Sequence, residues 1–456
     1  MNKNILITLP YSYSYRNIVL TGVLEQLLER GCKVMVVLPK ELCNEPPILT
    51  LMDRFPLQLR VSELIRPSAY TISNVLFLLC ASLMQKAQGT YSYKIKQRNS
   101  KYLGWKSFFK LRLLPIFLPK NKRVFLFLRW LLIKSLYNEN VLNTIKEFGP
   151  DVIFSTLNNK VNEYYYLAFG YENNINTVSL VHSWDVITTK GSFVLPTDSV
   201  LVWNKINELE YKFFVDSFFN SNSSVYKVGI PQFDVYKEHV NKTSLLSVKE
   251  KLGIPIDKQV VVYTTAVERL YPNEKLIVEK LMNDFERGRF PGKFLYVRLH
   301  PQESSSLYKN LPRNGNSFKL NIPEHNLAQI EDSVKFNSDT LLKLFDDLFV
   351  ADVVVNMASS ITLDSSALNK PVINLAFDHI NKPNESFYQS VERFYYTDHF
   401  SKIIGAHQSS VASSYSDLCD YIDNISEQCS QSTKTLRDAY IFDFGNGVNN
   451  IVSRII

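Results

Sequence analysis

Residues 351–373 read ADVVVNMASSITLDSSALNKPVI, and this stretch alone predicts the class of fold. A short apolar run at 352–355 is followed by a polar turn, by apolar residues at helical spacing over 361–368, and by a second apolar run at 371–375. Two buried strands joined by one helix are typical of a βαβ unit in a parallel sheet.

The same alternation continues upstream through both halves of the chain. In the C-terminal half, strands are expected at 259–264 and 294–299 and helices at 273–285 and 340–349. In the N-terminal half, strands are expected at 4–9, 33–38, 151–155, 177–181 and 199–203, and helices at 17–30, 142–148 and 208–219. We therefore predict an α/β protein with two Rossmann-like domains facing a central cleft: residues 1–235, residues 236–435, and a tail, 436–456, that is helical and packs back on the first domain.

The composition is that of a folded globular protein, because 45% of the 456 residues are hydrophobic and 21% are charged. The net charge of +7 is unevenly spread, since residues 91–140 hold 12 basic side chains and one acid. The chain outside this segment is slightly acidic. One local patch is therefore expected to meet an anionic partner.

The sequence indicates neither a metal site nor a transmembrane helix. The five cysteines are widely spaced with no CxxC pair, which favours a reducing cytoplasm over a disulfide framework or zinc site. The apolar runs at 75–84 and 124–133 are about half as long as a bilayer span needs. No metal or cofactor is expected.

The serine turn in 351–373 is the first candidate site. Ser359 and Ser360 lie where a helix begins, and hydroxyls with free backbone N–H groups at such a place can bind a phosphate or diphosphate. Asp364, one turn later, could reach a ribose hydroxyl. The alternative is that Ser359 only caps the helix, which is the common role of serine there.

A second strand of the same domain ends in the sequence Arg298-Leu299-His300-Pro301. Proline ends the strand and presents His300 at the carboxyl edge of the sheet. Arg298 and His300 could neutralise the charge on a leaving phosphate, although a single histidine is also often held by a loop carbonyl.

The third candidate follows a strand of the N-terminal half. His182 and Asp185 lie at the carboxyl end of that strand, with Lys190 just beyond. Asp185 is a candidate general base, His182 its partner, and Lys190 a ligand for a phosphate oxygen. The competing interpretation is that Asp185 only caps a helix, beside a buried Trp184.

Taken together, these motifs resemble the CDP-glycerol glycerophosphotransferases of teichoic-acid synthesis over roughly residues 181–380. The resemblance rests on the serine pair with Asp364, Lys370-Pro371 and Asp378, on His300-Pro301, on Gly229, Pro231 and Asp234, and on the Trp184 to Lys190 spacing. It implies a GT-B fold with metal-independent transfer, the nucleotide on the C-terminal domain and the acceptor on the N-terminal one.

Four residues depart from the family pattern. Asp185 and Val186 replace a His-Gly pair, Met357 replaces an acidic residue, and Gln232 replaces arginine. The His-Pro and Ser-Ser combination is also similar to that of bacterial sialyltransferases and Kdo transferases, without the Asp-Asp-Gly-type motif of the sialyltransferases. These departures favour a sugar over a polyol phosphate as the transferred group. Non-hydrolysing sugar-nucleotide epimerases share the fold, but their glycine-rich and arginine-rich motifs are absent from the sequence.

The basic segment 91–134 interleaves lysine and arginine with aromatic and leucine side chains, including Trp105-Lys106 and Phe108-Phe109-Lys110. This pattern is typical of a segment that binds an anionic membrane surface, although a solvated helix pair would also explain it. No nucleic-acid recognition motif accompanies the charge.

The sequence thus predicts a glycosyltransferase that moves a sugar from a nucleotide-activated donor to a lipid-linked or growing glycan in bacterial capsule or O-antigen synthesis. The protein would lie on the cytoplasmic face of the inner membrane. A CDP-glycerol-type polyol-phosphate transferase and a non-catalytic membrane- or polyanion-binding protein are the alternatives. The base and sugar of the donor, the acceptor, the linkage, the stereochemical outcome and the oligomeric state do not follow from the sequence.

Overall fold

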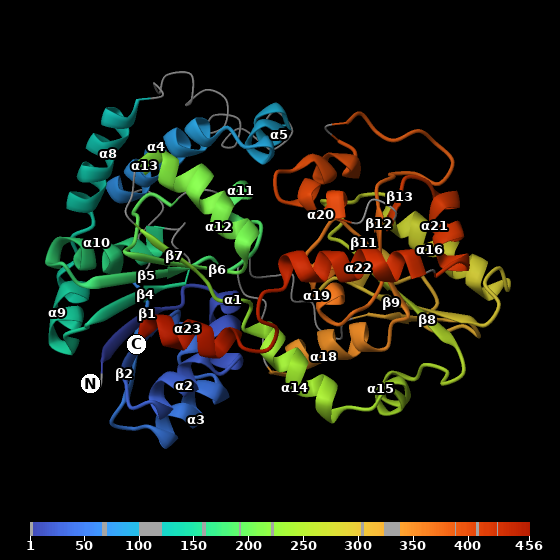
Figure 1. Cartoon of the computed structure of the whole chain (residues 1–456), viewed down its shortest axis with the longest axis horizontal. Coiled ribbons are helices and arrows are strands. Elements are labelled where there is room, and N and C mark those ends of the chain that lie inside the picture. Colours follow the sequence, from blue (N-terminus) through green and yellow to red (C-terminus); the bar gives the residue numbers. More distant parts are fainter. Residues whose placement is uncertain are drawn as a thin grey trace. The chain divides into compact units, whose positions relative to one another are not determined.

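The computed structural model describes residues 3–65, 71–99, 121–156, 161–190, 193–219, 223–301, 305–322, 338–387, 389–406, 410–425 and 427–456. The chain divides into two compact units (Figure 1). Unit 1 comprises Met1–Asp234 and Phe442–Ile456, and unit 2 comprises Val235–Ile441. The division falls inside one helix, α14 (Gln232–Lys242).

Unit 1 is built on a parallel sheet with the strand order β3-β2-β1-β4-β5-β6-β7. Its strands are β1 (Asn4–Thr8), β2 (Lys33–Leu38), β3 (Leu59–Glu63), β4 (Val152–Ser155), β5 (Asn176–Leu180), β6 (Ser199–Val202) and β7 (Ser224–Lys227). Its helices include α1 (Ser12–Tyr15), the π-helix η1 (Arg16–Leu20), α2 (Val23–Glu29), α3 (Pro46–Arg54), α4 (Ile72–Gln88), α5 (Tyr91–Asn99), α8 (Lys122–Ser135), α9 (Glu139–Phe148), α10 (Tyr164–Asn173), α11 (Val186–Thr189), α12 (Lys205–Tyr211), the π-helix η6 (Lys212–Asp216), α13 (Ser217–Phe219) and α23 (Gly447–Ile455).

Unit 2 has its own parallel sheet with the order β10-β9-β8-β11-β12-β13. The strands are β8 (Gln259–Thr264), β9 (Lys293–Arg298), β10 (Phe318–Asn321), β11 (Val353–Met357), β12 (Val372–Leu375) and β13 (Val411–Ala412). The helices include α15 (Leu245–Leu252), α16 (Glu274–Glu286), α17 (Ser305–Tyr308), α18 (Ser338–Phe349), α19 (Ile361–Ala367), α20 (Phe400–Ala406), α21 (Tyr415–Asp423) and α22 (Glu427–Tyr440). The predicted α/β class with two Rossmann-like units is confirmed.

Alternating strand residues explain why helices cover both faces of each sheet. In β1, Ile5 and Ile7 join a core with α2, α3 and α23, whereas Leu6 joins a second core with α4, α8, α9 and α10. In β11, Val353 and Val355 pack against α16 and α21. Each sheet is therefore the middle layer of three, which removes the apolar runs of both halves from water.

The helix expected at 17–30 is in fact broken. Residues 12–20 form α1 and the π-helix η1, and α2 begins only after Gly22, whose φ of 89° lies in the left-handed region. Gly31, with φ 83°, follows the end of α2. Glycine adopts this conformation without a Cβ clash, so it separates helical segments that apolar spacing alone would join.

The C-terminal helix α23 belongs to unit 1, and Asp234, the last residue of the motif Gly229, Pro231 and Asp234, holds it there. The Asp234 carboxylate accepts hydrogen bonds from the backbone N–H groups of Gly447 and Val448, both at 2.8 Å. Helix α23 lies beside α2 (Figure 1), and its buried side chains join the same core as those of α2. The expected tail boundary at residue 436 lies inside α22, which runs on to Tyr440 in unit 2.

Replacing Asp234 by Ala is expected to lower the free energy of unfolding of unit 1 by about 1–2 kcal/mol, the usual value of a helix N-terminal cap. Since the first turn of α23 then loses its acceptor, its amide protons should exchange faster with solvent. Hydrogen exchange of residues 447–455, read by mass spectrometry, measures this. Asp234→Asn, which keeps one acceptor oxygen, should lose about half as much. Unchanged exchange in both variants would contradict the capping role.

Part of the basic segment lies in α5 and α8, and the remainder, 100–120, lies outside the described residues, as do Trp105 and Phe108. Lys96 Nζ donates to the carbonyl of Thr189 at 2.7 Å, and Gln85 Nε2 donates to the carbonyl of Lys190 at 3.0 Å. The helices α4 and α5 are therefore fixed to the end of α11. Among the helices of the described residues, none has the length and apolar character needed to cross a membrane.

Candidate functional site

Four neighbouring strands of unit 2 end at the same edge of its sheet. Because β9, β8, β11 and β12 are parallel and adjacent in this order, the residues that follow them lie side by side. These are His300, Thr265, the serine turn at 359–360 and Asp378. Strands β9 and β11, which His300 and the serine turn follow, are two strand spacings or roughly 10 Å apart, and β8, which Thr265 follows, lies between them.

The serine turn satisfies its own backbone donors. The Ile361 N–H donates to Ser359 Oγ at 3.3 Å, and the Thr362 and Leu363 N–H groups donate to the carbonyls of Ser359 and Ser360 at 3.2 and 2.9 Å. The first-turn N–H groups are therefore not the free donors expected from the sequence. Ser360 is exposed, so its hydroxyl is the donor that this turn offers to an anion.

His300 is held by the end of β8. Its backbone N–H donates to Thr265 Oγ1 at 2.9 Å, and the Thr265 N–H donates to the Arg298 carbonyl at 3.0 Å. Burial, and secondarily the positive charge of Arg298, lower the pKa of the His300 imidazole from 6.5 to about 4. His300 is thus neutral at pH 7 and meets an anion as a hydrogen-bond donor, not as a cation.

The lowered pKa predicts a pH dependence of stability. Between about pH 6.5 and 4 the unfolded chain binds a proton at His300 that the folded chain excludes, so stability falls as pH falls through this window. Since one pKa unit corresponds to about 1.4 kcal/mol, the loss amounts to about 3 kcal/mol at pH 4 and below.

Denaturant titrations of wild type and His300→Gln between pH 7 and 4 test this. The variant should show a correspondingly shallower pH dependence. Parallel pH profiles would contradict a neutral, half-buried His300.

Arg298 forms a buried ion pair with Asp347. Its Nε donates to Asp347 Oδ2 at 2.8 Å, and the Tyr296 hydroxyl donates to Asp347 Oδ1 at 2.8 Å. Burial raises the pKa of the Asp347 carboxyl, against the opposing effect of Arg298. The negative charge of Asp347 therefore largely compensates the positive charge that Arg298 brings to this edge of the unit 2 sheet.

Asp364 faces a different partner from the one expected. It is buried on α19, where its Oδ1 accepts a hydrogen bond from the Tyr236 hydroxyl at 3.0 Å. This contact joins α19 to α14 within unit 2. The structure accordingly gives Asp364 a role in packing two helices, and its expected contact with a ribose stays a prediction.

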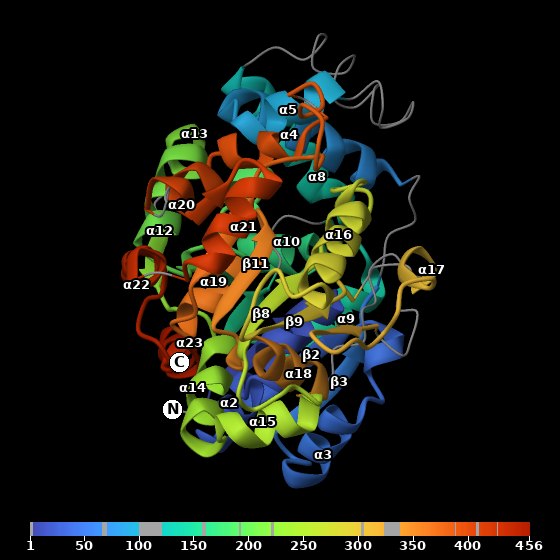
Figure 2. The same ribbon diagram turned by 90° about the vertical axis from the view of Figure 1, so that its right-hand side faces the viewer.

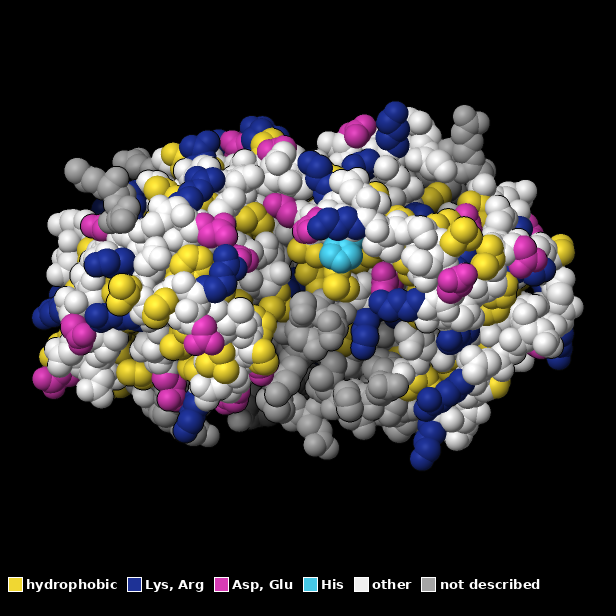
Figure 3. Space-filling view, turned by 90° about the horizontal axis from the view of Figure 1, so that it is seen from below, with side chains coloured by type: hydrophobic (Ala, Val, Ile, Leu, Met, Phe, Trp, Pro, Cys, Tyr) yellow, Lys and Arg dark blue, Asp and Glu magenta, His cyan; other side chains and the backbone are white. Residues whose placement is uncertain are grey.

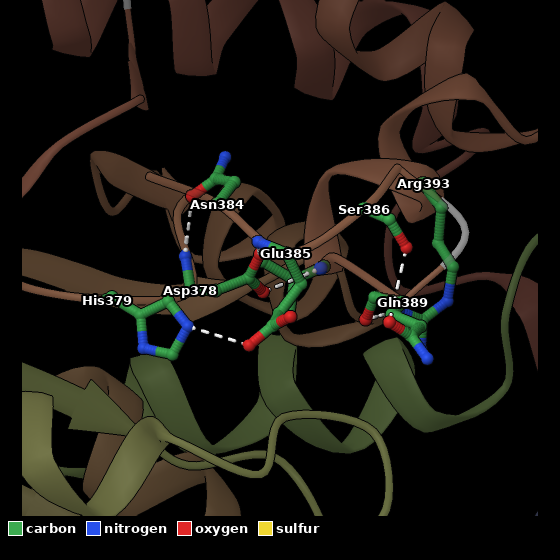
Figure 4. A network of polar contacts seen from close by, with 8 residues as sticks. Asp378, His379, Asn384, Glu385, Ser386, Gln389 and Arg393 are labelled. Atoms are coloured by element: carbon green, nitrogen blue, oxygen red, sulfur yellow. Dashed lines mark hydrogen bonds and ion pairs between the residues drawn. The ribbon is translucent and has the colours of Figure 1, made fainter. Parts of the chain in front are cut away.

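A polar loop after β12 completes this edge, and the site prediction from sequence did not include it. The buried Asp378 carboxylate accepts from the backbone N–H groups of Glu385 at 3.1 Å and Val391 at 2.9 Å (Figure 4). Asn384 Oδ1 accepts from the Asp378 N–H, and His379 Nε2 lies 2.9 Å from Glu385 Oε1. The position of Asp378 directly after a buried strand was the sequence signal that could have indicated this loop. The contacts that shape the loop, however, reach as far as Val391, thirteen positions away.

In unit 1, His182 and Asp185 lie at the carboxyl end of β5. Asp185 Oδ1 accepts from Ser183 Oγ at 2.5 Å, and its Oδ2 accepts from Thr189 Oγ1 at 3.0 Å. His182 is buried and stacks on the ring of Tyr13, with the ring centroids 4.9 Å apart. Two hydroxyl donors thus orient the Asp185 carboxylate, and His182 is fixed by an aromatic neighbour.

The π-helix after β1 also contacts this loop. Asn17 Nδ2 donates to the His182 carbonyl at 3.4 Å, and Asn17 Oδ1 accepts from Arg16 Nε at 3.1 Å. A π-helical turn is uncommon and is often found at functional sites. Lys190, at the end of α11, is exposed.

Glu163 is a second residue absent from the sequence prediction. It is fully buried where β1 and β4 end, and it accepts from Thr8 Oγ1, from Ser155 Oγ at 2.9 Å and from the Thr156 N–H at 3.0 Å. Buried carboxylates are rare without such donors. Glu163 therefore ties two strand ends of unit 1 together, and no local sequence pattern indicates this.

The predicted site residues form two groups. His300, Arg298, Ser359, Ser360 and Asp364 belong to unit 2, and His182, Asp185 and Lys190 belong to unit 1. Within the described residues, no group of three or more His, Cys, Asp or Glu side chains is arranged to hold a metal ion. In a space-filling view, Lys and Arg are interspersed with Asp and Glu over the visible face (Figure 3).

Two Rossmann-like units with polar strand ends define the GT-B class of fold. The chain belongs to the CDP-Glycerol:Poly(glycerophosphate) glycerophosphotransferase family, whose model matches residues 196–456. No curated protein sequence matches the chain significantly. The resemblance inferred from the sequence motifs is therefore confirmed, and the chain is a transferase of this family.

Solved structures that are similar to the chain share little sequence with it. A putative UDP-N-acetylglucosamine 2-epimerase from Listeria monocytogenes has 11% identity and a TM-score of 0.56, covering 100% of this chain and 96% of its own. The UDP-GlcNAc 2-epimerase from Neisseria meningitidis, bound to UDP-GlcNAc, has 10% identity and a TM-score of 0.53, covering 99% of both chains. The wall teichoic acid polymerase TagF has 11% identity and a TM-score of 0.48, covering 99% of this chain and 88% of its own. At such identities the likeness to the two epimerases concerns the fold alone.

Proposed function

We propose that this protein transfers a polyol phosphate from a CDP-activated donor to an acceptor hydroxyl. The observation that carries the proposal is the family match over residues 196–456, which contains all four strand ends of the unit 2 edge. This reverses the order of preference drawn from sequence, where a sugar was favoured as the transferred group.

The edge of unit 2 suits the diphosphate of such a donor. The exposed Ser360 hydroxyl and the neutral His300 imidazole are hydrogen-bond donors at strand ends on either side of Thr265. Donors fixed in advance stabilise charge as it develops on a leaving phosphate. Arg298 adds a positive charge two residues before His300, compensated by Asp347.

The bonds exchanged in this reaction are defined. The acceptor oxygen forms a bond to the donor phosphorus, the bridging P–O bond of the diphosphate breaks, and CMP leaves with the electron pair. The acceptor proton passes to a base, for which we propose Asp185. Its two hydroxyl neighbours, Ser183 and Thr189, hold the carboxylate in one orientation.

Transfer of a sugar from a nucleotide-activated donor is the second candidate. It is favoured by Asp185 and Val186, which depart from the His-Gly of the family and lie before the matched residues begin. In this version the acceptor oxygen attacks the anomeric carbon and the nucleotide leaves. Both candidates share the remaining features of the proposal. The acceptor is a lipid-linked or growing surface glycan, and the transfer is metal-independent and takes place at the cytoplasmic face of the membrane.

Nucleotide binding and product analysis test the proposal. Among CMP, CDP, UDP and GDP, the cytidine nucleotides should raise the melting temperature most, since ligand binding stabilises the folded state. CDP-glycerol should then yield CMP and a product that contains phosphorus. A phosphorus-free product from a nucleotide sugar would replace the first candidate by the second. If no nucleotide stabilised the chain, both would fail, leaving a non-catalytic binding protein on this scaffold.

A further inference from the structure

Three polar side chains are buried between the sheet of unit 2 and the first turn of α19. Asn356 and Asn374 lie opposite each other on the neighbouring strands β11 and β12, and Thr362 follows Ser360 by two residues on α19. Asn356 is 1% exposed, and the other two are fully buried. Helix α19 contacts both strands and packs beside α22 (Figures 1 and 2). We name Asn356, Thr362 and Asn374 the buried triad.

Hydrogen bonds join every member of the buried triad to the other two. Asn356 Oδ1 accepts from Asn374 Nδ2 at 2.7 Å and from Thr362 Oγ1 at 3.2 Å. Asn374 Nδ2 also donates to Thr362 Oγ1 at 2.9 Å. Apolar contacts have no preferred direction, whereas a hydrogen bond requires a defined distance and angle. The buried triad therefore fixes the position of the first turn of α19 relative to two strands at once.

The buried triad is an expensive way to hold a helix on a sheet. Among the described residues, Asn356 Nδ2 and Asn374 Oδ1 have no hydrogen-bond partner, although both atoms are buried. A buried donor or acceptor that lacks a partner destabilises the folded state. Apolar side chains of similar shape would pack between the same elements without this cost. Stability alone therefore does not explain why these positions are polar.

The segment that the buried triad positions is the serine turn. Only Ile361 separates Thr362 from Ser360, and the Thr362 N–H donates to the Ser359 carbonyl at 3.2 Å. A shift of Thr362 therefore moves the exposed Ser360 with it. Strand β11, which carries Asn356, lies inside the sheet between β8 and β12 and provides a rigid support. A displacement of about 1 Å can remove most of the effect of a binding group.

We propose that Asn356 and Asn374 are positioning residues for donor binding. Through Thr362 they hold Ser360 at the place where its hydroxyl meets the diphosphate of a nucleotide-activated donor. This inference rests on the proposed function, which puts the donor diphosphate at the serine turn. Because the buried triad has no exposed surface to offer, it acts through the turn and makes no contact with the donor itself. Donor affinity then depends on residues that the donor does not touch.

Replacing the whole triad by apolar residues separates position from stability. In the triple variant Asn356→Val, Thr362→Val and Asn374→Val, no polar atom of the triad is left buried without a partner. Its melting temperature should therefore equal or exceed that of the wild type. The dissociation constant for CDP, measured by isothermal titration, should nevertheless rise by about tenfold or more. Amide hydrogen exchange of residues 359–363 should be faster in the triple variant without any ligand.

Two single replacements at Thr362 test the link between the strands and the helix. Thr362→Ser keeps the hydroxyl that joins both asparagines and should retain the CDP affinity of the wild type. Thr362→Val removes the hydroxyl and should weaken CDP binding. Ser365→Ala is the matched control, because Ser365 is also buried on α19 and its hydroxyl has no hydrogen-bond partner among the described residues. This control should leave CDP affinity unchanged.

The outcomes distinguish a failure of this inference from a failure of the proposed function. If the wild type binds CDP and the triple variant binds it equally well, the inference is wrong and the proposed function stands. If CDP affinity falls only in step with a lower melting temperature, or if Thr362→Ser loses as much affinity as Thr362→Val, the triad is merely structural and the inference is again wrong. If the wild type binds no nucleotide, the proposed function fails, and the inference fails with it.

Discussion

Replacing Asp185 by Asn is expected to lower kcat by a factor of about 10² to 10⁴, the usual range for removing a general base, with little change in donor affinity. The amide keeps the size of the carboxylate, and the hydroxyls of Ser183 and Thr189 can rotate to accept or donate, so the loop should keep its shape. An amide cannot take the acceptor proton. Steady-state kinetics and a nucleotide titration on the same preparation separate the two effects.

Asp198 provides a matched control in the same unit. Its Oδ2 accepts from the Thr177 N–H at 2.8 Å and from Thr177 Oγ1 at 2.7 Å, just before β6, at the amino edge of the sheet. Asp198→Asn should leave kcat close to that of the wild type. If Asp185→Asn were as active as Asp198→Asn, Asp185 would not be the base.

Replacing Asp347 by Ala is expected to lower the free energy of unfolding of unit 2 by about 3–5 kcal/mol, because the change leaves Arg298 as a buried charge without its partner. The Tyr296 hydroxyl also loses its acceptor. Chemical denaturation followed by circular dichroism, with hydrogen exchange of β9 and α18, measures the loss.

Two further variants show whether charge pairing is the cause. Asp346, the preceding residue, is also buried but pairs with Lys251, whose side chain is largely exposed. Because water can solvate the lysine that Asp346→Ala leaves unpaired, this change should cost clearly less than Asp347→Ala. Arg298→Met combined with Asp347→Leu removes both charges and should recover most of the stability. Failure of this double variant to recover would attribute the loss to packing instead of the ion pair.

Strand and helix positions were readily predicted because their signals are local. Apolar runs of strand length, helical spacing and the stop at Gly31 lie within a few residues of the elements they define. His300, Ser360, His182 and Asp185 were found for the same reason, since each follows directly after a buried strand. The break at Gly22 was missed because the apolar spacing continues through it.

The partners of these residues were beyond sequence reasoning. Thr265 contacts His300 across thirty-five residues, and Asp347 neutralises Arg298 across forty-nine. The sequence predicted that Arg298 and His300 could neutralise a leaving phosphate. The structure adds that Asp347 compensates the charge of Arg298 and that burial lowers the pKa of His300.

The amino-acid sequence by itself determined the α/β class, the two halves and the strand ends that carry polar side chains, because hydrophobic periodicity and turn residues act over short distances. Only the tertiary structure decided which strand ends are neighbours, that Glu163 and Asp378 organise their edges, and that Asp234 fixes the C-terminal helix to unit 1. Strand order and burial arise from packing between distant segments, and it is this packing that sets the charge and hydrogen-bonding state of each candidate residue.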